Sequence, residues 1–234
     1  MSEKIGILSD IHGNYEALKK VLQSAKSKKI NEFIFCGDLV GYYYEPKKCL
    51  NILSKYEVTF IKGNHEIMMK NFLKKKIKKD KILSKYGNGL FEAIKKLSNQ
   101  EIKFLTGLRN TRSLKINNKI INISHGSPWS PNSYLYKDTP DKIYKKFKNL
   151  KEDIFILGNT HRQMKLNKFK KIILNPGSVG QPRDKRGLAC WASINKNNFK
   201  IEFFSERYNK TKLFSQIKKI ENDYLYNLKV LKKN

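Results

Sequence analysis

The chain has 234 residues, of which 39% are hydrophobic and 12% aromatic, and this composition excludes a disordered protein although 29% of the residues are charged. No apolar run approaches about 18 residues, and no basic stretch followed by a long apolar run opens the chain, so we expect neither a transmembrane helix nor a secretory leader. The three scattered cysteines, Cys36, Cys49 and Cys190, favour reduced thiols in a cytoplasmic protein.

Short apolar runs alternate with helical patterns along the first third of the chain, which predicts parallel strands joined by right-handed crossovers. The region from about 66 to 110 is predicted to be helical, and the second half is rich in strands. The predicted strands are 5–8, 33–36, 58–61, 113–116, 120–124, 154–157, 172–174, 188–194 and 199–204. The other predicted helices are 14–28, 46–55, 141–150 and an amphipathic C-terminal helix at 208–232. Because no linker divides the chain, we interpret residues 1–234 as a single domain.

The formal net charge of +29 raises the question of a nucleic-acid partner. Only six of the 49 basic residues are arginine, and the lysines are spread over almost every predicted surface. This dispersal favours a solvated basic surface over a dedicated nucleic-acid face, and the run of seven lysines at 70–81 is the strongest alternative.

Polar residues that can bind metal follow five of the predicted strands. The segments are Asp10-Ile11-His12, Gly37-Asp38, Gly63-Asn64-His65, Ser124-His125-Gly126 and Gly158-Asn159-Thr160-His161. The carboxyl ends of strands in an α/β sheet are where binding sites form, and imidazole, carboxylate and amide groups suit Zn, Mn or Fe. Each segment alone is more typical of a turn or a helix cap. All four histidines of the chain fall in these segments, however, and this coincidence favours a metal site.

The order DxH, GD, GNH, H and GxxH resembles the signature of the calcineurin-like metallophosphoesterases. The segments "SDIHGNYEAL", "GDLVGYYYEP", "GNHE", "SHGSP" and "NPGSVGQPRD" are similar to the compact bacterial and archaeal phosphodiesterase branch, which includes diadenosine tetraphosphatase-like members. The resemblance covers about residues 4–205. It implies an α/β fold in which two mixed β-sheets pack as a sandwich flanked by helices, in four α/β/β/α layers.

The resemblance also implies two divalent metal ions bridged by the carboxylate of Asp38. The implied ligands are Asp10, His12 and His161 for the first ion and Asn64 and His125 for the second. A water or hydroxide between the ions would attack phosphorus in line, and His65 would assist the departing ester oxygen. The alternative for His65 is a structural role beside its neighbour Asn64.

One position departs from the family pattern, because this chain has Asn159 where the family motif GHTH has a histidine. An amide oxygen is a weaker and harder ligand than an imidazole nitrogen, so we expect a second site that binds less tightly and prefers Mn or Mg to Zn. Mn is the expected metal, with Fe, Ni, Zn and Mg as alternatives. In the other interpretation, Asn159 points away and water takes its place.

Further expectations concern the substrate. Arg183 could reach a phosphate group with its planar guanidinium, and Tyr42 to Tyr44 could either line the cleft or pack against the helix that begins at Pro46. The expected activity is hydrolysis of a phosphodiester, with a small phosphate ester or nucleotide as substrate and no membrane partner. The alternatives are a diadenosine polyphosphate hydrolase, a nuclease and a metal-poor binding scaffold of the same fold.

Overall fold

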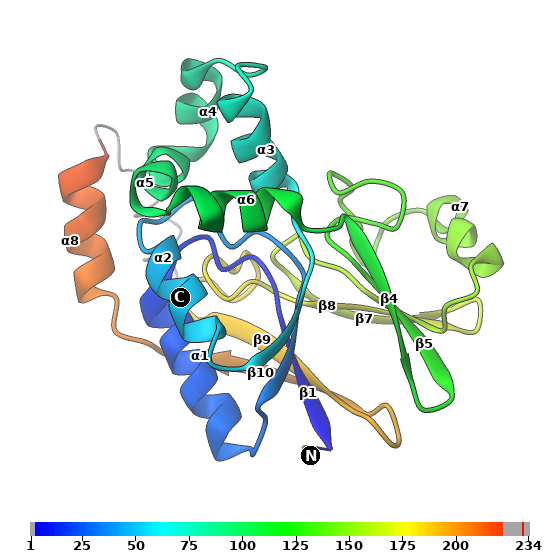
Figure 1. Cartoon of the computed structure of the whole chain (residues 1–234). Helices are drawn as coiled ribbons and strands as arrows, with labels where there is room; N and C mark the ends of the chain where they lie inside the picture. The colour runs from blue at the N-terminus through cyan, green and yellow to red at the C-terminus, as the bar shows by residue number, and fades with distance from the viewer. Residues whose placement is uncertain (1–2, 222–230, 232–234) are drawn as a thin grey trace.

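The computed structural model describes residues 3–221 and Leu231, and two five-stranded mixed sheets form its centre (Figure 1). The strand order is β10-β9-β1-β2-β3 in the first sheet and β4-β5-β6-β8-β7 in the second. The strands of the first sheet are β1 (Lys4–Leu8), β2 (Glu32–Phe35), β3 (Glu57–Phe60), β9 (Ala189–Asn195) and β10 (Ile201–Glu206). Those of the second are β4 (Thr111–Ile116), β5 (Lys119–Ser124), β6 (Ile154–Ile156), β7 (Gln163–Lys168) and β8 (Lys171–Pro176).

Helices cover both outer faces of the sheet pair. They are α1 (Tyr15–Ser27), α2 (Pro46–Leu53), α3 (Asn64–Leu73), α4 (Lys79–Tyr86), α5 (Gly89–Lys96), α6 (Asn99–Gly107), α7 (Asp141–Tyr144), the 3₁₀ helix η1 (Lys145–Asn149) and α8 (Thr211–Ile220). Figure 1 shows α1 and α2 beside the first sheet and α7 on the far side of the second. No helix among the described residues has the length and apolar character to cross a membrane.

Three apolar cores hold these layers together. Between the sheets, isoleucines such as Ile7 and Ile34 pack with Ile123 and Ile156 of the opposite sheet. A second core joins the outer face of the first sheet to α1, and a third packs η1 against the outer face of the second sheet. Since burying each large aliphatic side chain contributes about 1.5–3 kcal/mol, these three cores fix the order of the layers. The predicted four-layer sandwich is confirmed.

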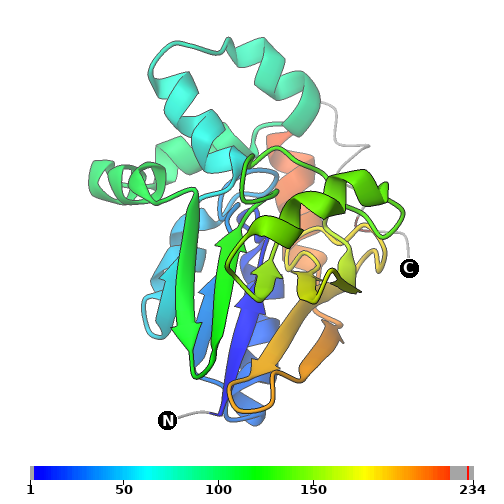
Figure 2. The same cartoon turned by 90° about the vertical axis from the view of Figure 1, so that its right-hand side faces the viewer.

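Sequence signals set the ends of several helices. The side chain of Asn14 accepts a hydrogen bond from the backbone N–H of Ala17 and so caps α1, as predicted. Ser98 and Glu101 form a capping box that begins α6. The predicted helical region consists of α3 to α6, which stand above the ends of the sheets in both views (Figures 1 and 2). This arrangement places the helical insert over the carboxyl end of β1.

The strand β7 was absent from the sequence prediction. It pairs with β8 through a two-residue turn in which Phe169 and Lys170 both have positive φ, the conformation of a type I′ hairpin. Asn and Gly are the usual residues of such a turn, and neither is present here, so the sequence carries no signal for it.

Two predicted helices differ from the structure. The helix expected at 141–150 is divided into α7 and the 3₁₀ helix η1. The helix expected at 208–232 begins at Thr211 and ends at Ile220, since the backbone of Glu221 is extended. Residues 222–230 and 232–234 lie outside the described residues. The interpretation of 1–234 as one domain stays a prediction.

Candidate metal centre

The five polar segments expected to form a site are brought together by the topology of the sheets. Each segment follows one strand. Asp10 and His12 follow β1, Asp38 follows β2, and Asn64 and His65 follow β3. His125 follows β5, and Asn159 and His161 follow β6. β1, β2 and β3 are parallel neighbours, as are β5 and β6, so each set of carboxyl ends meets at one edge. All four histidines and both carboxylates are therefore buried in one cluster.

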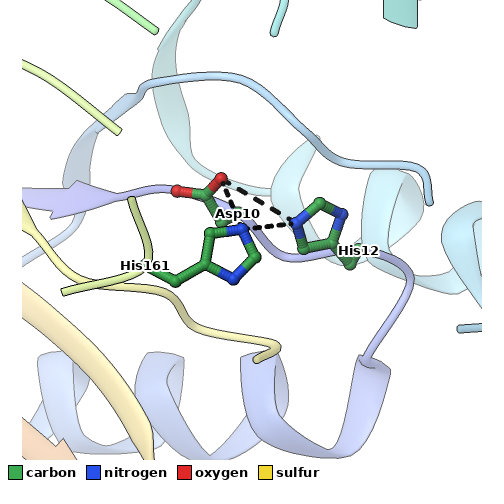
Figure 3. A group of neighbouring side chains, drawn as sticks. All are labelled: Asp10, His12 and His161. Atoms are coloured by element: carbon green, nitrogen blue, oxygen red, sulfur yellow. Dashed lines mark hydrogen bonds and ion pairs between the residues drawn. The ribbon is translucent and has the colours of Figure 1, made fainter. Parts of the chain in front are cut away.

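Asp10, His12 and His161 form one half of the cluster (Figure 3). The Nε2 atoms of the two histidines are 3.1 Å apart, and Oδ1 of Asp10 lies 3.2 Å from Nε2 of His161. The same oxygen lies 3.8 Å from Nε2 of His12 and 3.8 Å from Nε2 of His125. It has no hydrogen-bond partner in the part of the chain that the structure describes. A buried carboxylate oxygen that faces three imidazole nitrogens fits a shared cation.

Asp38 lies at the centre of the other half. Its Oδ2 is 3.1 Å from Nε2 of His125 and 3.9 Å from Nε2 of both His12 and His65. Its Oδ1 accepts a hydrogen bond of 2.8 Å from the backbone N–H of His65. Ligand atoms of Asp10, Asp38 and His125, and those of His12, Asp38 and His65, lie within 4.8 Å of one another. Asp38 therefore contacts residues from both halves.

Three of the histidines have the same hydrogen bond behind the ring. Nδ1 of His12 lies 3.0 Å from the carbonyl of Val40, that of His125 lies 2.7 Å from the carbonyl of Cys36, and that of His161 lies 2.7 Å from the carbonyl of Gln181. A carbonyl oxygen only accepts hydrogen bonds, so each Nδ1 carries the proton and each Nε2 is the atom left to bind a metal.

His65 differs from the other three histidines. Its Nδ1 is buried and has no hydrogen-bond partner among residues 3–221 and Leu231. The backbone therefore does not fix its tautomer as it does for the other rings. The ring is held instead by its neighbours, with centroids 4.8 Å from His12 and 4.8 Å from Tyr86.

The charges of the cluster are divided unevenly. Burial, together with the rings of His65 and His161, lowers the pKa of His12 well below its ordinary value, and burial also lowers the pKa of His65. Burial alone would lower the pKa of His125 too, but the Asp38 and Asp10 carboxylates and the Cys36 carbonyl together outweigh it and raise this pKa to about 10. Burial would raise the pKa of Asp38, yet His125 and His65 hold it well below its usual range. Without metal, Asp38 and His125 form a buried ion pair.

The backbone at the cluster is held in a conformation that L-residues avoid. The five residues with positive φ are Asp10 (54°), His12 (51°), Asp38 (63°), Asn159 (65°) and His161 (58°). Each such residue costs on the order of 1–2 kcal/mol. Concentration of this strain at one site is typical of functional sites and aims the side chains at a common centre.

The remaining predicted site residues lie at the edge of the cluster. Oδ1 of Asn64 is 2.8 Å from Nε2 of His125. The side-chain amide of Asn159 donates a hydrogen bond of 2.9 Å to the carbonyl of Ser133. The backbone N–H of Arg183 donates to the carbonyl of His161, which places this half-buried residue beside the cluster.

Glu66 was given no role in the sequence analysis, although it is the last residue of the quoted GNHE segment. Its buried carboxylate accepts hydrogen bonds from four backbone N–H groups, those of Asp38 (2.9 Å), Leu39 (2.8 Å), Val40 (3.1 Å) and Gly63 (2.7 Å). Burial and the Asp38 carboxylate raise its pKa to about 7, while the backbone N–H groups oppose this shift. Its position three residues after Gly63, at the start of α3, is the sequence signal that could have revealed it.

The three consecutive tyrosines have different surroundings. The ring of Tyr42 lies at the cluster, 4.7 Å from that of His12. Tyr43 and Tyr44 are buried in a core with Leu213 and Ile217 of α8. The core that holds these two tyrosines therefore includes α8, which the sequence analysis had not linked to them.

Comparison with known proteins agrees with this geometry. Residues 4–197 match the family described as the calcineurin-like phosphoesterase superfamily domain. An uncharacterized protein of Methanocaldococcus jannaschii is 29% identical over 235 residues, which cover 92% of each chain. A hypothetical protein of Pyrococcus horikoshii has a TM-score of 0.81 and 20% identity over 99% of both chains. A metallophosphoesterase of Sphaerobacter thermophilus has a TM-score of 0.74 and 21% identity over 97% of this chain and 98% of its own.

Replacement of Glu66 tests how the loop that carries Asp38 is held. In Glu66→Gln an amide NH₂ replaces one carboxylate oxygen and leaves buried backbone N–H groups without an acceptor, so the free energy of unfolding is expected to fall by about 2–4 kcal/mol. Urea denaturation measures this change. Glu57→Gln, at an exposed position of β3, is the control and is expected to stay within about 0.5 kcal/mol of the wild type. Equal stability of the two variants would contradict this role of Glu66.

The raised pKa of His125 predicts that metal binding releases a proton. Below pH 10 the metal-free protein holds a proton on Nε2 of His125, and a metal ion bound to that atom must displace it. We expect Mn²⁺ binding to release about one proton from this residue near neutral pH, and the affinity to rise as the pH rises toward 10. Titration calorimetry in two buffers of different ionisation enthalpy counts the proton. His125→Asn is expected to lose it, and equal enthalpies in both buffers for the wild type would refute the prediction.

Proposed function

The chain belongs to the calcineurin-like phosphoesterase superfamily, whose members are hydrolases that act on phosphate esters, and from this premise we propose that it is a phosphodiesterase that uses two divalent metal ions. The observation that carries the proposal is the backbone hydrogen bond behind His12, His125 and His161, because it leaves three Nε2 atoms free to bind metal in the same buried cluster. The quoted segments similar to the phosphodiesterase branch support a diester as the substrate.

The residues fit two ions that share one carboxylate. We assign Asp10, His12 and His161 to the first ion, Asn64 and His125 to the second, and Asp38 to both. The orphaned Oδ1 of Asp10 and the contacts of Asp38 with both halves of the cluster support this assignment. When bound, two such ions act as Lewis acids that polarise the phosphoryl group and make a nucleophile from water at neutral pH.

His65 is proposed to act on the leaving group. Its lowered pKa keeps the imidazole neutral near pH 7, so one ring nitrogen carries a proton that can be donated in a hydrogen bond. As the P–O bond of the ester breaks, the departing oxygen gains negative charge, and a donor at this position stabilises it. Arg183, beside the turn of His161, is proposed to bind a phosphoryl oxygen with its guanidinium.

Hydrolysis of bis(4-nitrophenyl) phosphate in the presence of Mn²⁺ tests the activity. The wild type is expected to be active, His65→Ala to lower kcat by about 10²–10⁴-fold, and Asp38→Asn to lose metal and activity together. Asp141→Asn, at a side chain that is 66% exposed, is the control and is expected to keep full activity.

A pure folded wild type that hydrolyses nothing with Mn, Fe, Ni, Zn or Mg would refute the proposal. Diadenosine polyphosphates and nucleic acids in the same assay separate the two related activities, and a low metal content after purification would indicate a scaffold.

Asn159 is proposed to bind the second ion through its amide oxygen. Its NH₂ group donates a hydrogen bond to Ser133, so the amide oxygen, on the opposite side of the amide group, is the atom left to bind a metal ion. Asn159→His is expected to raise metal affinity, and activity at limiting metal, because imidazole is the stronger ligand. A histidine is compatible with the positive φ of this position, since His12 and His161 adopt the same conformation. Titration with Mn²⁺ and Zn²⁺ measures the change, and unchanged affinity for both metals would show that residue 159 does not bind metal.

A further inference from the structure

Tyrosines from three separate segments lie near the cluster. The rings of Tyr42 and Tyr86 contact that of His65, and Tyr134 follows Ser133, whose carbonyl accepts a hydrogen bond from Asn159. The ring of Tyr86, at the end of α4, lies 4.8 Å from that of His65 and 5.8 Å from that of Tyr42. Tyr42 is only 4% exposed, whereas Tyr86 is partly exposed and Tyr134 is 49% exposed. Tyr86 and Tyr134 are therefore the members of this set that a bound molecule can touch.

These two tyrosines share their surroundings with Arg183. Burial and the Asp38 carboxylate raise the pKa of Tyr86, whereas Arg183 lowers it. Burial also raises the pKa of Tyr134, on which Arg183, Tyr86 and Asp38 all act. The two phenols and the guanidinium thus lie within electrostatic reach of one another and of Asp38.

A carboxylate beyond the last sheet strand holds the turn that follows Tyr86. Both oxygens of Glu221, which follows α8, accept from the backbone N–H of Asn88, at 2.8 and 3.1 Å, and Oε2 accepts from the Asn88 side chain at 3.0 Å. Oε1 also accepts a hydrogen bond from the hydroxyl of Tyr44. Gly87 has φ +69°, and a Cβ atom there would come within 2.8 Å of this carboxylate. Glu221 is 7% exposed, so its position is closely defined by these contacts.

We propose that Tyr86 and Tyr134 bind a planar aromatic group of the substrate, an aryl or nucleoside ester group, and that Glu221 is a positioning residue that holds Tyr86 beside His65. The proposal rests on the phosphoesterase function proposed above. Tyrosine rings offer stacking faces to any planar base, and a guanidinium beside them offers hydrogen bonds to phosphate. Because Tyr86 contacts the histidine assigned to the leaving group, the aromatic group is the one that departs.

Binding of two ligands to the Mn-loaded full chain separates this role from metal binding. Adenosine monophosphate contains the aromatic group, and inorganic phosphate lacks it. Tyr86→Leu and Tyr134→Leu are each expected to raise the Kd of adenosine monophosphate on the order of 10-fold, with the Kd of phosphate changed less than about twofold, as measured by titration calorimetry. Phe104→Leu, at an aromatic residue of α6 that is 45% exposed, is the control and is expected to leave both constants unchanged. Equal effects of Tyr86→Leu and Tyr134→Leu on the two ligands would overturn the proposal.

Glu221→Gln tests the positioning role. Glutamine has one acceptor oxygen where glutamate has two, so it cannot keep all the hydrogen bonds from Asn88 and Tyr44. We therefore expect a several-fold rise in the Kd of adenosine monophosphate and no change for phosphate. In Tyr86→Leu the further change Glu221→Gln is expected to add nothing, because Glu221 acts through Tyr86. A lower Tm with an unchanged ratio of the two constants would assign Glu221 a structural role alone and overturn this part. If the wild type binds adenosine monophosphate and phosphate with the expected difference but hydrolyses no ester, only the phosphoesterase function is contradicted. If the wild type is active and Tyr86→Leu leaves the ratio of the two Kd values unchanged, only this inference is contradicted.

Discussion

The buried carboxylate of Asp38 is the charge on which the rest of the site depends. It is 1% exposed, and a carboxylate removed from water in this way is costly unless cations or hydrogen-bond donors surround it. His125 supplies the positive charge at 3.1 Å and the backbone N–H of His65 supplies a hydrogen bond. Metal ions at the same place would replace the proton of His125 as the compensating charge. The features that stabilise Asp38 without metal are therefore features that also suit it to the proposed role of metal ligand.

A further buried carboxylate, that of Glu66, holds this arrangement through backbone hydrogen bonds. Two neighbouring negative charges repel each other, and the four backbone N–H groups around Glu66 offset part of this cost. Those N–H groups belong to the loop after β2 and to the start of α3, which carry Asp38 and His65. One side chain thus ties the central carboxylate to the histidine assigned to the leaving group. The strained backbone of Asp10, His12 and His161 is held in place by backbone hydrogen bonds to other segments. The N–H groups of Asp10 and His12 donate to the carbonyls of Gly37 and Asp38, and the carbonyl of His161 accepts from the N–H of Arg183.

The sequence identified the strand ends and the cluster because these depend on local pattern. Apolar runs mark β1, β2 and β6, and polar residues directly after them can be read from the chain without knowledge of distant contacts. Glu66 is only partly readable in this way, because Gly63 lies three residues before it but Asp38 lies 28 residues away. Glu221 could not be assigned at all, because its partner Asn88 lies 133 residues away. The turn between β7 and β8 was missed for a different reason. Phe169 and Lys170 adopt positive φ there, whereas such turns usually contain Asn or Gly.

The proposed chemistry of the cluster and the proposed recognition of the substrate belong to different parts of the chain. The proposed metal ligands all lie within residues 4–197, at strand ends whose positions are fixed by two packed sheets. Tyr86 lies on a helical insert that makes no strand pairing, and its neighbouring turn is held by Glu221, beyond the matched residues. Substitutions in an insert that is held by a few hydrogen bonds leave the sheets undisturbed, whereas a substitution of Asp38 alters the charge balance of the whole cluster. The same fold can therefore keep one reaction and accept different esters, and in this chain the contact between Tyr86 and His65 is where the two parts meet.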